Sequence, residues 1–387
     1  MDPELDSIFE QCRIAVEDPE YPGLQEWKKT NPDGLVLGHF QVYFPEEIAH
    51  AAGMFPLKMM GADTSVQIRE ADAHIAAFVC SILRTSLEQA MAGRLDPLAI
   101  YVTHPICDAA RHLNGVWTRQ FADTNCQILY FPHNAASAHG TAYLTSEYRR
   151  IATLIEETTG RPISDEALRA SIEIFNENRR LLRRLYHIRR ETPWLVSLVE
   201  SYLLTRSAGV MDRRRHNELL GRALRLIEAR SARPQDKVRV VFEGGFCEQP
   251  PIELLSVLQD VAYVVDDDLL IGLRWLTEDV PTVGDPIENL AVAYLESSSY
   301  SPVQRDPRKP KEEMLLARIR NAGADAAIVG AAKMCEPGLE EQVTYDDALR
   351  EAGVPHLIME FEEKTANFEQ ARMEIETFAE SMLFEFA

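Results

Sequence analysis

The chain has 387 residues, 46% of them hydrophobic, which is enough apolar sequence for two or three domains that each bury a core. Its 61 acidic and 40 basic residues give a formal net charge of −21, which argues against a nucleic-acid-binding protein. No apolar run approaches the roughly 20 residues that span a bilayer, and the first residues, MDPELDSIFEQC, do not resemble a secretory signal. Six cysteines are too sparse for a disulfide framework, so we expect a cytoplasmic protein.

The first third of the chain alternates between strand-like and helix-like segments. Short apolar segments predict four strands, at 34–40, 55–61, 97–104 and 126–132. Helices are expected between them, at 45–53, 72–93 and 108–121. This alternation is typical of a parallel sheet with helices on both faces.

The middle of the chain, residues 138–235, has a different pattern. Long arginine-rich segments with helical spacing of apolar residues predict a helical linking segment. Two basic runs stand out, RRLLRRLYHIRR at 179–190 and DRRRH at 212–216. Each fits either a solvated helix face or a surface for a phosphorylated ligand or an acidic partner.

Strand–helix alternation resumes in residues 236–387. Strands are expected at 237–245, 261–268, 324–335 and 355–362. Helices are expected at 250–260, 311–323 and 345–353, with a last helix at the end and an irregular stretch at 285–310. Because this order repeats that of the first third, we predict an α/β protein with two similar parallel-sheet domains, Rossmann-like or flavodoxin-like. They cover residues 1–137 and 236–387 and are joined by 138–235.

Two cysteines occupy matching places in the two predicted domains. Cys107 and Cys335 each follow a hydrophobic strand, in AIYVTHPIC and AAIVGAAKMC, and ligands of open α/β sheets bind beyond the carboxyl ends of the strands. Cys80 lies in the predicted helix before the third strand, near the same edge. Three soft thiolates between two domains would suit an iron–sulfur cluster or zinc. The spacing contains no CxxC, so purely structural cysteines remain an alternative.

Several blocks of the sequence resemble one family in the same order along the chain. They are GLVLGHFQVYFPEEIAHAAGMFPLKMMGA, HPICDAAR and AAKMCEPGLEEQVTYDDALREAGVPHLIMEFE. The chain resembles the 2-hydroxyacyl-CoA dehydratase and benzoyl-CoA reductase family. EGGFCEQPPIELL and VVDDDLLIGLRW are most similar to the smaller, gamma-type active-site subunit of the ATP-dependent benzoyl-CoA reductases. Many dehydratase relatives have a cysteine where this chain has Leu270, which favours the reductase branch.

The resemblance implies a cofactor and a set of partners. Cys80, Cys107 and Cys335 would hold a 4Fe–4S cluster with three cysteine ligands and one open iron. A paralogous larger active-site subunit would complete the enzyme, and a separate ATPase activator would carry the ATP and a further 4Fe–4S cluster. The chain itself has no GxxxxGK[ST] motif. Ferredoxin would be the upstream electron donor, and no nucleic acid or membrane is expected as a partner.

The implied function is that of an oxidoreductase subunit. It would pass low-potential electrons to an aromatic acyl-CoA thioester, so that the ring is reduced. Two alternatives remain. One is a subunit of a 2-hydroxyacyl-CoA dehydratase, a lyase that uses the same cluster for radical-based water elimination. The other is a non-catalytic scaffold subunit.

Reduction of a ring also requires a positioned acid. His104, just before Cys107, and His133, at the end of the fourth strand, are candidates, although a turn histidine bonded to backbone is the alternative for each. Glu47 would serve if buried, but an exposed carboxylate at a helix N-terminus is more common. Arg111 is a candidate for binding the phosphates of coenzyme A. Cys247, which also follows a strand, is a candidate pocket residue or a further ligand.

Overall fold

A computed structural model gives the positions of residues 2–40, 43–62, 65–95, 97–244, 247–269, 272–275, 277–301, 304–362 and 367–385. These residues form two four-stranded sheets in which all strands are parallel. The strand order is β2-β1-β3-β4 in the first sheet and β6-β5-β7-β8 in the second. The strands are β1 (Val36–Phe40), β2 (Phe55–Met59), β3 (Leu98–Thr103), β4 (Asn125–Ile128), β5 (Val238–Gly244), β6 (Ala262–Asp267), β7 (Ala326–Ala332) and β8 (His356–Phe361). The repeated order confirms the prediction of two similar parallel-sheet domains.

Central strands explain why this fold could be predicted from hydrophobic runs. Every residue of β1 and of β7 is buried, because helices cover both faces of each sheet. The edge strands β4 and β8 are partly exposed and correspondingly more polar. The strands stay parallel, but the order in which the chain adds them reverses within each sheet, between β1 and β3 and between β5 and β7. Such a switch point leaves a crevice at the carboxyl ends of the strands, where ligands bind.

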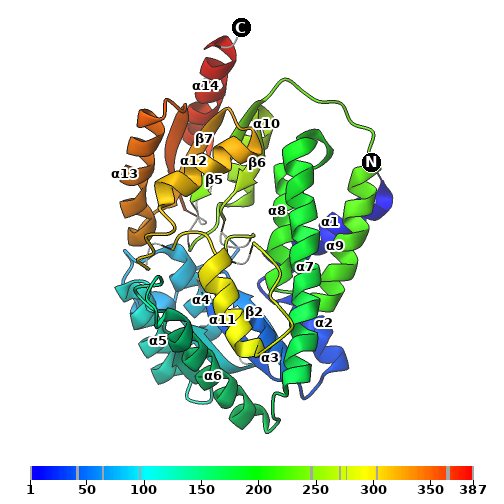
Figure 1. Ribbon diagram of the computed structural model, residues 1–387, viewed down its shortest axis with the longest axis vertical. Coiled ribbons are helices and arrows are strands. Elements are labelled where there is room, and N and C mark those ends of the chain that lie inside the picture. Colours follow the sequence, from blue (N-terminus) through cyan, green and yellow to red (C-terminus); the bar gives the residue numbers. More distant parts are fainter. Residues whose placement is uncertain are drawn as a thin grey trace.

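Helices surround the sheets and form a separate layer on one side of the molecule (Figure 1). The helices next to the sheets are α3 (Glu46–Ala51), α4 (Ser81–Met91), α5 (Asp108–Gln120), α10 (Ile252–Val261), α12 (Lys311–Ala322), α13 (Glu336–Glu351) and α14 (Glu369–Glu385). The others are α1 (Pro3–Glu17), α2 (Pro22–Thr30), α6 (Gly140–Thr159), α7 (Asp165–Glu191), α8 (Leu198–Arg206), α9 (Arg213–Glu228) and α11 (Pro286–Ser297). In the lateral layer α7 packs on α9, and α1 packs on α8 and α9. None of the helices in the described ranges has the length and apolar character needed to cross a bilayer.

Three elements differ from the sequence-based expectation. The helix expected at 72–93 is confined to α4, so Cys80 precedes it and does not lie within it. The stretch expected to be irregular contains α11, which begins where Asp285 accepts hydrogen bonds from the N–H groups of Ile287 and Glu288. Helix α13 begins at Glu336, nine residues before the expected 345, because a proline in its first turn fits a helix start.

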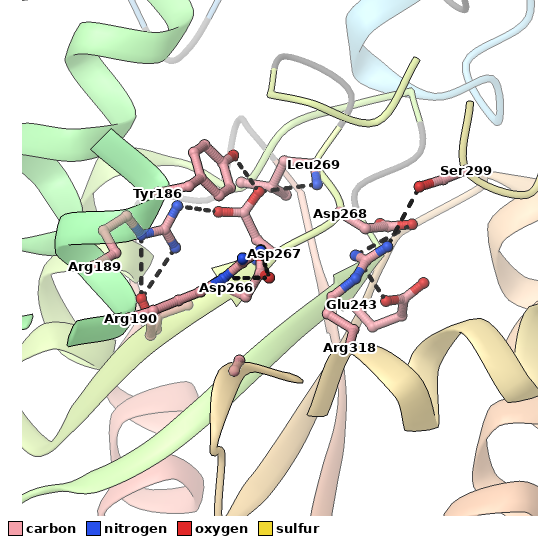
Figure 2. Close-up of polar contacts among 12 residues, drawn as sticks. Tyr186, Arg189, Arg190, Glu243, Asp266, Asp267, Asp268, Leu269, Ser299 and Arg318 are labelled. Atoms are coloured by element: carbon pink, nitrogen blue, oxygen red, sulfur yellow. Dashed lines mark hydrogen bonds and ion pairs between the residues drawn. The ribbon is translucent and has the colours of Figure 1, made fainter. Parts of the chain in front are cut away.

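Several arginines of the two basic runs form ion pairs with carboxylates of the same chain. On α7, Arg179 pairs with Glu47, Arg184 with Glu228 and Arg189 with Asp267. Figure 2 shows the ion pairs at the carboxyl end of β6. Asp266 pairs with Arg190 and Asp267 with Arg189, both on α7. Asp268, the residue after β6, pairs with Arg318 of α12. The run at 212–216 is anchored by Arg213, which pairs with Glu46. Arg179, Arg189, Arg190 and Arg213 therefore attach the helical layer to the two sheet domains, whereas Arg184 joins α7 to α9.

Candidate functional site

Four of the six cysteines line one cavity of about 710 Å³. Cys80 and Cys107 come from the first sheet domain, and Cys247 and Cys335 come from the second. Cys107 follows the carboxyl end of β3, while Cys247 and Cys335 follow those of β5 and β7. The cavity therefore lies where the carboxyl ends of both sheets meet, as expected for ligand sites of this fold class.

Cys80, Cys107 and Cys335 share a position in local structure. Each is the residue directly before a helix, at the N-termini of α4, α5 and α13 respectively. The sulfur of Cys107 accepts a hydrogen bond of 3.4 Å from the N–H of Ala110. Helix N-termini present unpaired N–H groups and partial positive charge, which favour anionic sulfur and oppose the effect of burial on these thiols.

Burial is the main cause of the pKa shift in three of the four thiols, and the neighbouring Cys247 thiol is the main cause in Cys335. Burial raises the pKa of the Cys80, Cys107 and Cys247 thiols, and the neighbouring cysteines raise them further. The interaction between the Cys247 and Cys335 thiols lowers the pKa of Cys335. Cys80, Cys247 and Cys335 are each at most 7% exposed. The set is thus a group of sulfur donors around one cavity, three buried and Cys107 half-buried, whose protons would be displaced by a soft cation.

Cysteines usually hold one of two kinds of metal centre, a single ion or an iron–sulfur cluster. Among the residues with described positions, no three cysteine, histidine, aspartate or glutamate side chains are close enough to share one metal ion. An iron–sulfur cluster is larger than an ion, and its thiolates bind to different irons, so its ligands stand farther apart. Four soft sulfur donors around a cavity of about 710 Å³ fit such a cluster.

A buried carboxylate connects the two halves of the site. Glu248 is fully buried, and its carboxylate accepts hydrogen bonds from the hydroxyl of Ser81 at 2.7 Å and from the N–H of Ile82 at 3.2 Å. The N-cap residue of α4, Cys80, makes no capping bond with its own side chain. Glu248 therefore caps α4 from the other domain. Sequence reasoning missed this residue, because CEQPP does not distinguish a buried carboxylate from a solvated one.

The mouth of the cavity has a basic side and an apolar side. Arg111, His112 and Arg119 are exposed on α5 and line it. Phe78 and Met334 line it as well and are 74% and 58% exposed. Met334 has a φ of 62°, the left-handed region that non-glycine residues seldom occupy. The cavity thus combines buried sulfur donors with an accessible rim that contains three potential cations.

The three candidate proton donors lie elsewhere, and none is among the described residues that line the cysteine cavity. His104 is buried, donates from Nδ1 to the carbonyl of Leu129 at 3.2 Å, and has its pKa lowered by burial to about 3. Glu47 is buried, ion-paired with Arg179, and lines a separate pocket of about 110 Å³. His133 is exposed at a third pocket, of about 520 Å³. Leu270 lies outside the described residues.

Comparison with known proteins identifies the class. Residues 41–382 match the family model described as 2-hydroxyglutaryl-CoA dehydratase, D-component. The chain is 34% identical over 377 residues to a benzoyl-CoA reductase subunit of Thauera aromatica, covering 97% of this chain and 98% of that relative. It is 28% identical over 381 residues to the lactoyl-CoA dehydratase beta subunit of Anaerotignum propionicum (98% and 99% covered). It is 26% identical over 379 residues to the (R)-phenyllactyl-CoA dehydratase beta subunit of Clostridium sporogenes (97% and 99% covered). The chain belongs to the 2-hydroxyacyl-CoA dehydratase and benzoyl-CoA reductase family, as its motifs predict.

Proposed function

We propose that this chain is the iron–sulfur active-site subunit of an ATP-dependent benzoyl-CoA reductase, in which it passes low-potential electrons to an aromatic acyl-CoA thioester. The observation that carries the proposal is the position of Cys80, Cys107 and Cys335, which line one cavity, each at a helix N-terminus. The 34% identity over nearly the whole chain to a relative named as a benzoyl-CoA reductase subunit supports the reductase branch.

Cys80, Cys107 and Cys335 would hold a 4Fe–4S cluster, and these three thiolates alone would leave one iron open. The cluster would supply one-electron chemistry at low potential when bound. The chain's own contribution is electrostatic and steric. The N-termini of α5 and α13 favour negative charge at Cys107 and Cys335, whereas the N-terminus of α4 is capped by the Glu248 carboxylate. Cys80 and Cys335 are buried, which limits the access of water to their side of the cavity.

Acyl-CoA binding and proton supply are assigned to residues outside the cysteine set. Arg111 at the rim of the cavity would bind the phosphates of coenzyme A. His104, His133 and Glu47 are the proposed acid–base groups. In the conformation described here His104 Nδ1 donates to a carbonyl, so its Nε2 is a proton acceptor. His133 is exposed whereas His104 is buried, so His133 is the more accessible donor.

The enzyme would be a heteromer. A paralogous larger active-site subunit would form the second half, and an ATPase activator with its own 4Fe–4S cluster, reduced by ferredoxin, would supply the electrons. All three relatives named above are themselves subunits of reductases or dehydratases, which supports a multi-subunit assembly.

Iron and sulfide analysis of the anaerobically purified protein tests the proposal. We expect about four irons and about four sulfides per chain, as in a 4Fe–4S cluster, and we expect Cys107→Ala to lose most of this iron. Cys126→Ala is the matched control, because Cys126 is half-buried on β4 and is not among the described lining of the cavity. Wild-type protein without iron, or a Cys107→Ala variant with unchanged iron, would contradict the proposal.

The second candidate is a subunit of a 2-hydroxyacyl-CoA dehydratase, which the names of two relatives and of the family model favour. The two activities differ in electron demand. A reductase consumes electrons and ATP in proportion to product, whereas a dehydratase recycles its electron and needs only a priming amount. An anaerobic assay of the complete complex with benzoyl-CoA and with 2-hydroxyacyl-CoA substrates separates them by this stoichiometry.

A further inference from the structure

We propose that the chain has a binding site for phosphate groups, formed by Arg305, Lys309 and Lys311. These side chains line the cavity of about 520 Å³ at which His133 is exposed, a volume within the range of small-molecule sites. The site is separate from the cysteine cavity, which Arg111 lines. Two sources of phosphate fit the same chemistry, the CoA part of an acyl-CoA and a free nucleotide. Only the first of these sources rests on the proposed function.

Backbone contacts between the two domains hold Arg305 at this cavity. Its N–H donates to the carbonyl of His133 at 2.6 Å, and its carbonyl accepts from the N–H of Ala135 at 3.0 Å. The side-chain amide of the buried Gln304 donates to the carbonyl of Pro132 at 3.0 Å. The guanidinium of Arg305 takes part in none of these bonds. It is exposed and, within the described part of the chain, has no carboxylate partner, so it is available to an anion.

The two lysines of the site are partly buried. Lys309 donates to the Ser298 hydroxyl at 2.9 Å, and burial lowers its pKa to about 8. The Nζ of Lys311 lies 5.4 Å from the ring centre of Tyr300 and 3.9 Å from the carboxylate of Glu341. Ammonium groups that have lost part of their hydration favour an anion beside them. A bound phosphate would supply that anion to both lysines.

Two carboxylates also line the cavity, but they do not neutralise it. Asp306 is already paired with Arg308, whose guanidinium donates to both of its oxygens at 2.9 Å. Glu312, in the first turn of α12, is the other. Three cations thus face a single carboxylate that has no arginine partner, in a chain with a net charge of −21. The N–H groups at the start of α12 add partial positive charge, because its N-cap residue, Pro310, supplies no side-chain acceptor.

Helix α13 connects this site to the cysteine cavity. Lys311 lies by Glu341, and α13 begins directly after Cys335, six positions before Glu341. Six residues correspond to roughly 9 Å along a helix. A molecule with phosphate groups at one end and its reactive group on a long arm, as in an acyl-CoA, spans such a separation. A free nucleotide would occupy the phosphate site alone.

Isothermal titration calorimetry of the anaerobically purified full chain tests the inference with CoA, ADP and pantetheine. We expect CoA, ADP or both to bind, and pantetheine, which has no phosphate, not to bind. Arg305→Ala should weaken the binding about 10-fold or more, because it removes a charge-assisted hydrogen bond. Arg305→Lys keeps the charge and should lose less. Arg320→Ala is the matched control, because it removes one cation from the exposed far end of α12 and should bind as the wild type does.

The fold of Arg305→Ala is expected to survive, because the contacts of Arg305 with His133 and Ala135 use backbone atoms only. An unchanged urea midpoint checks this. CoA binding that depends on Arg305 supports the site with acyl-CoA as the source, and ADP binding without CoA binding supports it with a free nucleotide. Equal dissociation constants for the wild type and Arg305→Ala would overturn the inference. So would the absence of binding by both CoA and ADP, or pantetheine that binds as tightly as CoA.

The iron content of the same samples keeps this inference separate from the proposed function. Protein that holds a cluster but shows no Arg305-dependent binding would overturn the phosphate site alone. Iron-free protein that binds ADP through Arg305 would overturn the proposed function alone.

Discussion

The carboxylate of Glu248 accepts a hydrogen bond of 2.7 Å from the hydroxyl of Ser81, 167 positions earlier in the chain. The two residues belong to different sheet domains, and each directly follows a cysteine of the cavity. Because the contact is fully buried, it fixes the separation of the two domains at the point where the sulfur donors meet.

Removal of the Glu248 carboxylate should destabilise the folded protein. Glu248→Ala leaves the Ser81 hydroxyl and the Ile82 N–H without their acceptor, and we expect the free energy of unfolding to fall by about 2–3 kcal/mol. Glu248→Gln retains an acceptor oxygen and should lose less. Urea denaturation of the metal-free protein measures both. Glu253→Ala, an exposed carboxylate in the first turn of α10, is the control and should change little. Equal midpoints for Glu248→Ala and Glu253→Ala would contradict this assignment.

Arg189 and Asp267 form a buried ion pair that joins α7 to β6 (Figure 2). The hydroxyl of Tyr186 donates a further bond of 2.8 Å to Asp267. Arg189→Leu leaves Asp267 buried without its cation, so we expect a loss of about 3–5 kcal/mol in the free energy of unfolding. Arg184→Leu on the same helix breaks a pair with Glu228 whose side chains are about 40% exposed, and should cost less than about 1 kcal/mol. Similar costs for the two variants in urea denaturation would show that burial does not determine the strength of these pairs.

Most of the fold follows from local signals in the sequence. The strands β1 and β7 can be predicted from continuous apolar runs, because both of their faces are buried. Helix α11 was missed although Asp285 and Pro286 are a normal helix start, because the serine-rich segment after it suggested a loop. The early start of α13 was missed because Pro337 and Gly338 resemble a turn.

The candidate site was predictable only in part. The place of Cys107 and Cys335 after matching strands predicted that they would lie at the carboxyl edges of two sheets, and the structure brings them to one cavity. The role of Glu248 depends on a contact with Ser81 across the domains, which no local pattern in one sequence encodes. The internal pairing of the α7 arginines likewise depends on carboxylates from β6 and α3.

His216 should make stability sensitive to acid. It is fully buried, donates from Nε2 to the carbonyl of Leu204 at 2.8 Å, and accepts at Nδ1 from the amide of Asn178 at 2.8 Å. Burial lowers its pKa from 6.5 to about 3. Between about pH 3 and pH 6.5, His216 therefore binds a proton in the unfolded chain but not in the folded chain. The stabilisation is complete above pH 6.5 and is lost as pH falls toward 3, by about 1.4 kcal/mol per pH unit.

Urea denaturation between about pH 4 and 7 tests this assignment. His216→Gln should be less stable than the wild type near neutral pH, because the buried bonds are perturbed, but its stability should fall less steeply with acid. His139→Gln, at an exposed position, is the control and should retain the wild-type slope. An unchanged slope in His216→Gln would show that this histidine is not the group that titrates.

Glu341 has the opposite pH dependence. Its side chain is buried, with Lys311 at 3.9 Å, and burial raises its pKa from 4.5 to about 7 against the opposing charges of Arg274 and Lys311. The folded chain holds a proton that the unfolded chain has lost over this range, so the contribution of Glu341 is favourable below pH 4.5 and is lost as pH rises to 7.

Glu341→Gln imitates the protonated side chain at every pH. We therefore expect it to be more stable than the wild type at about pH 8, by about 2 kcal/mol, and similar to it at about pH 4. Paired urea denaturation curves of the metal-free proteins at the two pH values measure the difference. Glu340→Gln alters the exposed neighbour on α13 and should be neutral at both. Because only a buried ionised carboxylate gives a gain confined to high pH, an equal gain in acid would point to a change in packing and not to charge.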